Sequence, residues 1–436
     1  MRDLADLQRF KYLVDTLLTS TPDLVLMQPF TNELTAYLGN ICGISAEFDL
    51  NDWQHAKTAN GVAISPVSAA KCSLETLRSQ IFMQGVQAAI TDKLASKPSI
   101  HILYAGTGPY GTLLLPYLAC HANLPIKVTL LDIHPENIAA VEKLIHHFGI
   151  ENYIEALVCD DATSWQPELG KQFDLIISET MTALLKNEPQ VWIFAHLVQF
   201  LAPDGCLIPE VISLKAQFLL KQIDDDDNLA AGEFFRLDQH SALSIQRKDL
   251  DCLQGHINVP AGITPKHKLG LTTDIQVYKQ HTLTLRQCSL NLPFTLPQPK
   301  DLLEAGAQIR FAYETPAQPE FVFYFPQGQQ PLSKANIVPS ESPSPSGLFH
   351  LSRAFQQARL QKYGDKIQPN DTDRLREQVL CNALGLTLHQ WYEHLFTCDS
   401  LEELEQCLQI LNPKLHGPDF VQNLNSKLLS SHSDIS

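Results

Sequence analysis

Two carboxylates in the segment FDLIISETMTALLKNE have the spacing and the setting of a cation site. Glu179 directly follows an apolar run that reads as a β-strand, and open α/β sheets place their ligand sites at the carboxyl ends of strands. Glu188 follows it in the same segment. Two such carboxylates can hold the planar donor fork of a guanidinium, and without a cation each raises the pKa of the other. The alternative is that Glu179 is structural and Glu188 is a solvent-facing helix residue.

A glycine-rich turn lies earlier in the chain. The stretch YAGTGPYG contains Gly106, Gly108 and Gly111, and it joins a strand pattern to an apolar helix pattern. Glycine allows a sharp turn and brings backbone N–H groups close to a ligand at the start of a helix. Dinucleotide-binding enzymes share this pattern, so the loop alone predicts only a nucleotide-like cofactor.

Acidic residues end the next two predicted strands. Asp132 closes IKVTLLD, where a carboxylate can accept hydrogen bonds from both hydroxyls of a ribose. Asp160 or Asp161, after the following strand, can accept one from an adenine amino group, although Asp160 could instead cap the next turn. A glycine loop, a ribose acid and an adenine acid at successive strand ends are typical of class I methyltransferases, which use S-adenosylmethionine (SAM). Other nucleotide enzymes remain an alternative.

The chain resembles the protein arginine methyltransferase family over about residues 70–300. The family's double-E loop has the form SE-x-M-x-x-x-L-x-x-E, and this sequence matches it at Ser178, Glu179, Met181, Leu185 and Glu188. The family also has an arginine before the glycine loop that pairs with the cofactor carboxylate. Arg78 looks like that residue.

The resemblance implies SAM as the cofactor and a guanidine nitrogen as the methyl acceptor, in free arginine, a related small molecule or a peptide. The cofactor-binding residues it implies are Arg78, Gly106, Gly108, Asp132, Asp161 and Glu179. It implies Glu179 and Glu188 as catalytic residues, which hold the acceptor together with Met181. Family members of this type are commonly dimers, so a homodimer is also expected.

Two departures from the family keep other functions open. The family's Thr-His-Trp loop has no match, and the nearest candidate is LTTDIQVY with Thr273 and Asp274. Tyr104 also replaces the usual acidic residue of the glycine loop. The alternatives are an O- or C-methyltransferase of a specialised metabolite and a SAM-binding scaffold without activity.

Periodicity divides the chain into five segments. Residues 1–95 read mostly as helices, with Ser73 as a helix cap, and residues 96–210 alternate strands and helices as in a Rossmann-like α/β domain. The run GCLIPEVISLKAQF, which crosses into the next segment, also reads as a strand. Residues 211–335 read as short strands of a β-barrel-like domain, including HKLGLTTDIQVY, HTLTLRQCSLNL, AQIRFAYET and FVFYFP. A Pro/Ser-rich linker at 336–349 precedes a helical module at 350–436.

Composition narrows the partners. The 436 residues carry a formal net charge of −16, which disfavours a general nucleic-acid binder and suits a cationic small molecule or peptide. No apolar run has the length of a membrane span, and the N-terminus has no apolar signal core, so we expect a cytoplasmic protein that binds no membrane. The scattered cysteines and histidines lack metal-ligand spacing, and we expect no metal site.

Overall fold

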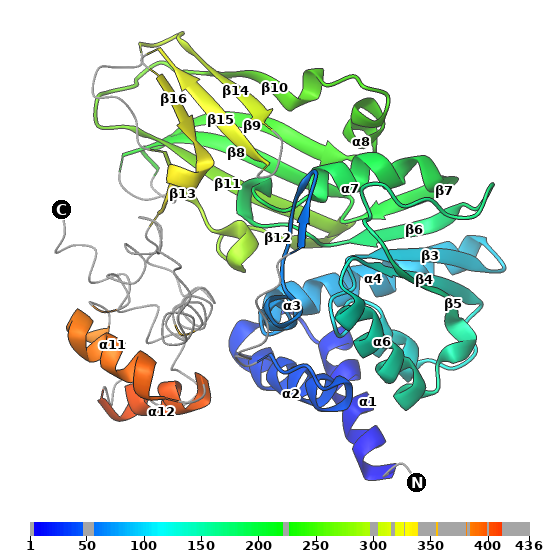
Figure 1. The fold of residues 1–436 in the computed structure, drawn as a ribbon. Helices are drawn as coiled ribbons and strands as arrows, with labels where there is room; N and C mark the ends of the chain where they lie inside the picture. The colour runs from blue at the N-terminus through cyan, green and yellow to red at the C-terminus, as the bar shows by residue number, and fades with distance from the viewer. Residues whose placement is uncertain are drawn as a thin grey trace.

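The computed structural model describes residues 4–46, 56–220, 226–296, 304–314, 319–326, 328–338, 355, 381, 384–398 and 401–411. Their fold is mixed α/β, with a parallel sheet in the N-terminal half, two antiparallel sheets after it and helices at both ends (Figure 1). This confirms the predicted fold class. Among the described helices, none is both long enough and apolar enough to cross a membrane.

The parallel sheet has the strand order β5-β4-β3-β6-β7. Its strands are β3 (Ile100–Ala105), β4 (Ile126–Asp132), β5 (Ile154–Cys159), β6 (Phe173–Ser178) and β7 (Leu201–Ile208). All six residues of β6 are buried, as expected for a central strand that is covered on both faces. The helices that follow these strands are α5 (Leu115–Cys120), α6 (Pro135–Phe148) and α7 (Gln190–Leu197). The chain order reverses around β3, so the carboxyl ends of β3, β4 and β6 meet at one edge.

The antiparallel part begins directly after β7. One sheet has the order β17-β13-β11-β8-β9, with β12 paired to β11, and the other has the order β10-β14-β15-β16. Their bounds are β8 Val211–Leu219, β9 Leu229–Asp238, β10 Gln254–Asn258, β11 Lys268–Tyr278, β12 His281–Leu283, β13 Phe294–Thr295, β14 Gln308–Glu314, β15 Glu320–Phe325, β16 Gly328–Pro331 and β17 Asn336–Ile337. Helix α8 (Gln239–Gln246) packs against α7. The rings of Phe234, Phe311 and Phe321 meet edge to face between the sheets and join them into a barrel-like unit.

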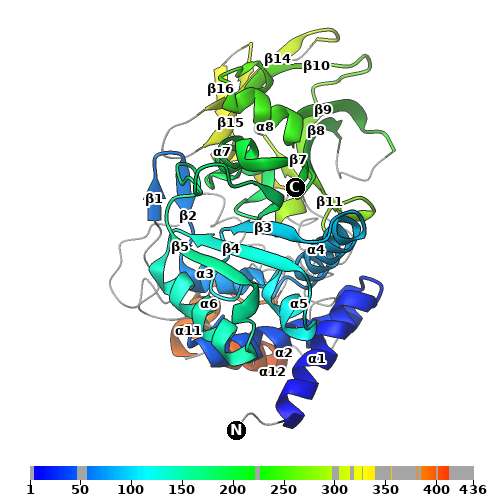
Figure 2. The same ribbon diagram turned by 90° about the vertical axis from the view of Figure 1, so that its right-hand side faces the viewer.

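Four N-terminal helices precede and support the parallel sheet. They are α1 (Leu4–Thr19), α2 (Leu24–Cys42), α3 (Pro66–Cys72) and α4 (Thr76–Ser96). The amides of Gln80 and Gln84 donate to the carbonyl oxygens of Leu17 and Ser20, which satisfies acceptors at the end of α1 and fixes α1 to α4. Figure 2 shows α1 and α2 packed beneath this half of the molecule.

A short hairpin interrupts the predicted helical segment. Strands β1 (Ala56–Thr58) and β2 (Gly61–Ala63) pair with each other and stand beside the parallel sheet (Figures 1 and 2). The predicted helix cap at Ser73 is wrong. Ser73 ends α3, where its hydroxyl donates to the carbonyl oxygen of Ala70, and Glu75 occupies the position before α4.

Two strand predictions in the second half are also corrected. The run GCLIPEVISLKAQF is not one strand, since β7 ends at Ile208 in the parallel sheet and β8 begins at Val211 in the antiparallel one. The run HTLTLRQCSLNL is a strand only in β12; a turn and a short 3-10 helix, η5 (Ser289–Asn291), follow. Strand β17 lies within the range predicted as linker, and residues 339–349 lie outside the described residues.

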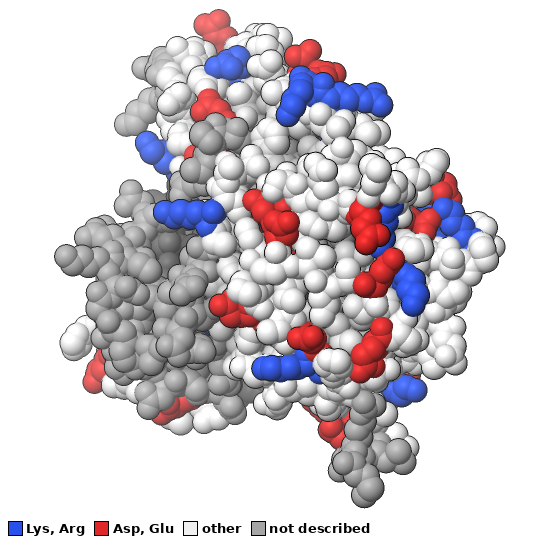
Figure 3. All heavy atoms as spheres, turned by 45° about the vertical axis from the view of Figure 1, so that its right-hand side comes forward, with Lys and Arg blue, Asp and Glu red and all other residues white. Residues whose placement is uncertain are grey.

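The described part of the C-terminal segment contains α11 (Leu388–Thr397) and α12 (Leu401–Leu411). Trp391 and Leu395 of α11 pack with Leu404 and Leu408 of α12 in a core separate from the main one. The domain boundaries themselves remain predictions. On the face drawn in Figure 3, acidic and basic side chains are interspersed.

Candidate functional site

A pocket lies at the carboxyl ends of β3, β4 and β6, beneath the β1–β2 hairpin and α3. Its empty volume is ≈ 980 Å³ with the space open to solvent included. The predicted site residues that line it are Arg78, Gly106, Gly108, Asp132, Asp161, Glu179 and Glu188. The structure therefore brings together residues that are far apart in the sequence, as the strand order requires.

The glycine loop brings the main chain close to Thr180, two residues after the end of β6. Gly106 has φ +74, and a Cβ built on it would lie 2.3 Å from Cγ2 of Thr180, so no larger residue fits there. Gly111 packs toward the side chain of Leu115 and is not among the residues that line the pocket. The N–H groups of Gly106 and Gly108 donate to the carbonyl of Leu131 and to Asp132, so they face the protein and not the pocket.

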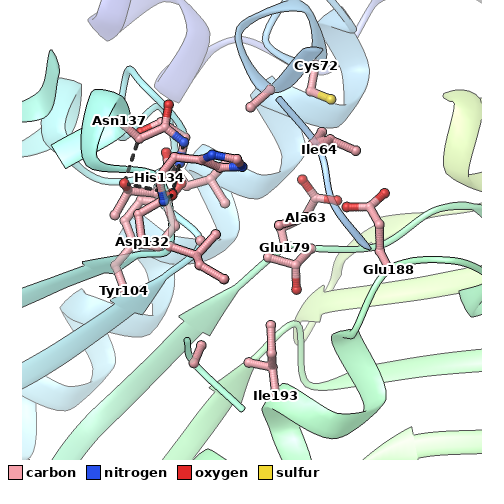
Figure 4. Close-up of a pocket in the computed structure, with 18 of the residues that line it drawn as sticks. Ala63, Ile64, Cys72, Tyr104, Asp132, His134, Asn137, Glu179, Glu188 and Ile193 are labelled. Carbon is pink, nitrogen blue, oxygen red and sulfur yellow. Dashed lines mark hydrogen bonds between the residues drawn. The ribbon is translucent and has the colours of Figure 1, made fainter. Parts of the chain in front are cut away.

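Asp132 is a hub of internal hydrogen bonds. Its Oδ2 accepts from the N–H of Gly108 at 2.9 Å, and its Oδ1 accepts from the N–H of His134 at 2.9 Å and from Nδ2 of Asn137 at 3.0 Å. Thr107 Oγ1 lies 3.4 Å from Oδ2. The carboxylate is 5% exposed, and it ties the glycine loop to the first turn of α6 (Figure 4). Its acceptor positions are thus largely used before any ribose arrives.

The two partners of Asp132 on α6 leave polar atoms unused at the pocket. His134 Nε2 and Asn137 Oδ1 are buried, and no described residue forms a hydrogen bond with either atom. Both residues line the pocket. A buried polar atom without a partner is costly, so these two atoms mark a place for a polar ligand. Sequence reasoning missed them, although His134 and Asn137 stand just after the strand-end Asp132.

The two acids after β5 lie in different settings. Asp161 lines the pocket, whereas Asp160 is exposed and is absent from the lining. It is also Asp161 that caps the next turn, because its Oδ1 accepts from the N–H and the hydroxyl of Thr163, each at 2.8 Å. The turn-cap alternative therefore holds for the neighbouring residue.

Arg78 of α4 is paired with the first of the two glutamates. Its Nη2 lies 2.7 and 2.6 Å from the two carboxylate oxygens of Glu179, and Nη1 lies 3.4 Å from Glu75. The side chains of Arg78 and Glu179 are 8% and 10% exposed. Burial raises the pKa of the Glu179 carboxyl, and the Arg78 guanidinium opposes that rise.

Glu188 has no such partner. It lies just before α7, is 7% exposed, and no described residue forms a hydrogen bond with its carboxylate. Burial, with the charge of Glu179 as the second cause, raises the pKa of Glu188 to about 8. In Figure 4 both glutamates lie beside Ala63 and Ile64. The alternative in which Glu188 faces solvent on a helix is wrong.

The loop that joins the two glutamates has an unusual backbone. Leu184, Leu185 and Asn187 all have positive φ, at 60°, 55° and 68°, a region that residues other than glycine rarely adopt. Hydrogen bonds from neighbouring segments hold it: the N–H of Leu184 donates to Thr273 Oγ1 at 3.1 Å, and Tyr313 donates to the carbonyl of Leu185 at 2.8 Å. The loop is therefore fixed by the barrel-like unit.

Other predicted acceptor residues lie elsewhere. Met181 is 2% exposed in the main core and is not among the pocket residues. Asp274, considered with Thr273 for the substrate-side loop, pairs with Lys215 at 2.6 Å, and both of these side chains are partly exposed. The 3-10 helix η5 also contacts the loop that joins the two glutamates, and this contact was not predicted.

No known family model matches the chain, and no curated protein is similar to it in sequence. Among solved structures, the chain is similar to the Trypanosoma brucei PRMT1 enzyme–prozyme heterotetrameric complex with AdoHcy. That likeness has a TM-score of 0.39 and a sequence identity of 14%, and it covers 57% of this chain and 89% of the other. A likeness of this size assigns no family.

Proposed function

We propose that the protein is a SAM-dependent methyltransferase that methylates a nitrogen of a cationic acceptor, with a guanidine as the leading candidate. The observation that carries the proposal is the state of Glu188: a buried carboxylate without a partner, beside a second carboxylate, in a pocket at the carboxyl ends of parallel strands. A buried carboxylate of this kind is costly unless a cation or a hydrogen-bond donor joins it.

The far end of the pocket fits a nucleoside. His134 Nε2 and Asn137 Oδ1 are unpaired polar atoms at the strand end where ribose hydroxyls would lie. Asp161 uses Oδ1 in its turn, which leaves Oδ2 for an exocyclic amino group. Arg78 would hold the carboxylate of the amino-acid part. SAM, when bound, supplies a methyl group on a positively charged sulfur.

The charge of the acceptor end favours a cation. Among the described residues, three carboxylates, of Glu75, Glu179 and Glu188, lie near the one guanidinium of Arg78. When all are ionised, three negative charges face one positive charge, which leaves an excess of two. A cationic cofactor and a cationic acceptor together balance that excess. A single nitrogen of Arg78, Nη2, contacts both carboxylate oxygens of Glu179, and this contact supports the proposal that the carboxylate can receive a guanidinium.

The protein's part in the reaction is alignment and electrostatics. Glu188 binds a cation in its ionised form, so the proton that its raised pKa retains is released when the acceptor arrives. Glu179 and Glu188 then fix the orientation of the acceptor and draw its positive charge toward themselves, which leaves electron density on the attacking nitrogen. The hydrogen bonds of Thr273 and Tyr313 hold the loop in place.

The experiment compares Glu188→Gln with Glu142→Gln, a substitution at an exposed glutamate on α6. We expect Glu188→Gln to lower methyl transfer from labelled SAM by about a thousandfold, while its affinity for S-adenosylhomocysteine (SAH), measured by calorimetry, stays within about twofold of wild type. Glu142→Gln should change neither. Loss of SAH binding in Glu188→Gln, or full activity in it, would contradict the proposed role.

A further inference from the structure

The β1–β2 hairpin lies directly on the loop that joins Glu179 and Glu188, called the acceptor loop below. The N–H of Val62 donates to the carbonyl of Asn187 at 2.8 Å. Gly61 has φ +146, and a Cβ there would lie 2.8 Å from the same carbonyl oxygen and 3.2 Å from the carbonyl carbon of Glu188. The contact is therefore made by main chain against main chain, and glycine is needed for it. No space for another chain remains between the hairpin and this part of the loop.

The turn of the hairpin also contacts the segment after β5. Asn60 Nδ2 donates to Thr163 Oγ1 at 3.2 Å, and that hydroxyl donates to Asp161 at 2.8 Å. Asn60, Gly61 and Val62 are consecutive, so the turn end of the hairpin contacts both the segment of the predicted adenine acid and the loop before Glu188. Figure 2 shows the hairpin standing beside the carboxyl ends of the parallel strands, and Thr58, Ala63 and Ile64 from this segment line the pocket.

The hairpin and the barrel-like unit bound the pocket on two sides. Thr58, Ala63 and Ile64 line the pocket from the side of the hairpin. Behind the glutamates, Thr273 and Tyr313 are buried at 0% and 7% exposure and are hydrogen-bonded to the loop. An acceptor that reaches both carboxylates cannot continue past the loop between them, because the hairpin lies on one side of that loop and the barrel-like unit on the other.

We infer that the acceptor is a small, free cation and not an arginine within a polypeptide chain. This inference rests on the proposed function, which leaves free and peptide-borne acceptors open. A free guanidine or amine can pass under the hairpin and exchange its bound water for contacts with the two carboxylates. A peptide that continues on both sides of its arginine needs room for its main chain at the loop, and the hairpin occupies that room.

The experiment titrates SAH-loaded protein with free arginine, methylguanidine and the capped peptide acetyl-Gly-Gly-Arg-Gly-Gly-amide. We expect at least one free cation to bind about tenfold or more tightly than the peptide, because the peptide main chain would clash with the hairpin. Gly61→Ala places a side chain against the Asn187 carbonyl, so it should displace the hairpin and narrow that ratio severalfold. Gly170→Ala is the matched control, with a similarly unfavourable φ of +83 but nothing within 4 Å.

The outcomes separate the inference from the proposed function. Equal or tighter binding of the peptide to the wild-type protein would overturn the inference and leave the methyltransferase proposal intact. An unchanged ratio in Gly61→Ala would also contradict it. If SAH binds and none of the three probes does, the inference and the cationic acceptor both fail. If SAH itself does not bind, the proposed function fails as a whole.

Discussion

The two ends of the pocket treat their charged groups in opposite ways. At the cofactor end, Asp132 accepts hydrogen bonds from the glycine loop and from α6, and Asp161 caps a turn. At the acceptor end, Glu188 is buried without a described partner, and the loop before it holds three residues other than glycine at positive φ. The first arrangement is complete by itself, whereas we propose that the second is completed by a ligand.

Under the proposed function, this difference follows from the different ligands of the two ends. A cofactor that is the same in every turnover is met by a preformed platform, and its polar contacts need only a few unpaired atoms such as His134 Nε2 and Asn137 Oδ1. A cationic acceptor instead needs negative charge that the protein has not already neutralised. Keeping such charge lowers the stability of the ligand-free protein, as is common at functional sites.

The largest expected effect is at the platform. Asp132→Ala leaves the N–H groups of Gly108 and His134 and the amide of Asn137 without their acceptor, and we expect a loss of about 4 kcal/mol in the free energy of unfolding. SAH affinity should fall with it. Urea unfolding and SAH titration measure the two effects. Asp160→Ala, at an exposed neighbour, should cost less than about 0.5 kcal/mol. Equal losses in the two variants would contradict the platform role.

At the acceptor end, removing a carboxylate should raise the stability of the protein instead of lowering it. The folded-state pKa of Glu188 lies at about 8, above its ordinary value of 4.5, so its contribution to stability is complete below pH 4.5 and is lost as the pH rises through 8. Glu188→Gln removes that loss. We expect the variant to be more stable than wild type by several kcal/mol at pH 9 and nearly equal to it at pH 4.5. A difference that does not change with pH, measured by urea unfolding, would contradict an unpaired buried carboxyl.

The same group should make cation binding depend on pH. Because Glu188 must lose its proton to bind a cation, the affinity of SAH-loaded protein for a free guanidine should rise about tenfold from pH 7 to pH 9. Calorimetry in two buffers at pH 7 should detect release of close to one proton. Glu188→Gln should release none, and proton release that persists in it would assign the effect to another group.

A smaller effect is expected where the barrel-like unit holds the loop. Thr273→Val keeps the shape of the side chain but removes the acceptor for the N–H of Leu184, which should cost about 1 kcal/mol of stability. Turnover should fall severalfold while SAH affinity stays unchanged. Thr272→Val, at the neighbouring residue on the other face of β11, is the control. A parallel fall in SAH affinity would show that the residue supports the whole pocket and not the acceptor loop.

The sequence was sufficient to predict those features whose signal lies in a few neighbouring residues. The glycine loop, the strand-end acids and the spacing of Glu179 and Glu188 are each contained in a few consecutive residues, and the alternation of elements fixed the order in which they would meet. The pattern of short apolar strands separated by turn residues also predicted β11, β14 and β15. These are features in which local propensity and tertiary structure agree.

Tertiary pairing was beyond the reach of a single sequence. No local pattern indicates that Arg78 would pair with Glu179, or that His134 and Asn137 would keep unpaired atoms. The hairpin had one signal, the dipeptide Asn60-Gly61, which favours a tight turn, but its strands are only three residues long. Ser73 was mistaken for a cap because α3 and α4 follow one another so closely.

The central claim is tested most directly by the fate of the methyl group. The protein is incubated with SAM that carries a ¹³C-methyl group and with the free cations named above, and the product is examined by NMR and mass spectrometry. The account predicts a new N–¹³CH₃ signal on a guanidine nitrogen, absent with Glu188→Gln and retained with Glu142→Gln. A methyl group on oxygen or carbon, or bound SAM that is never consumed, would contradict it.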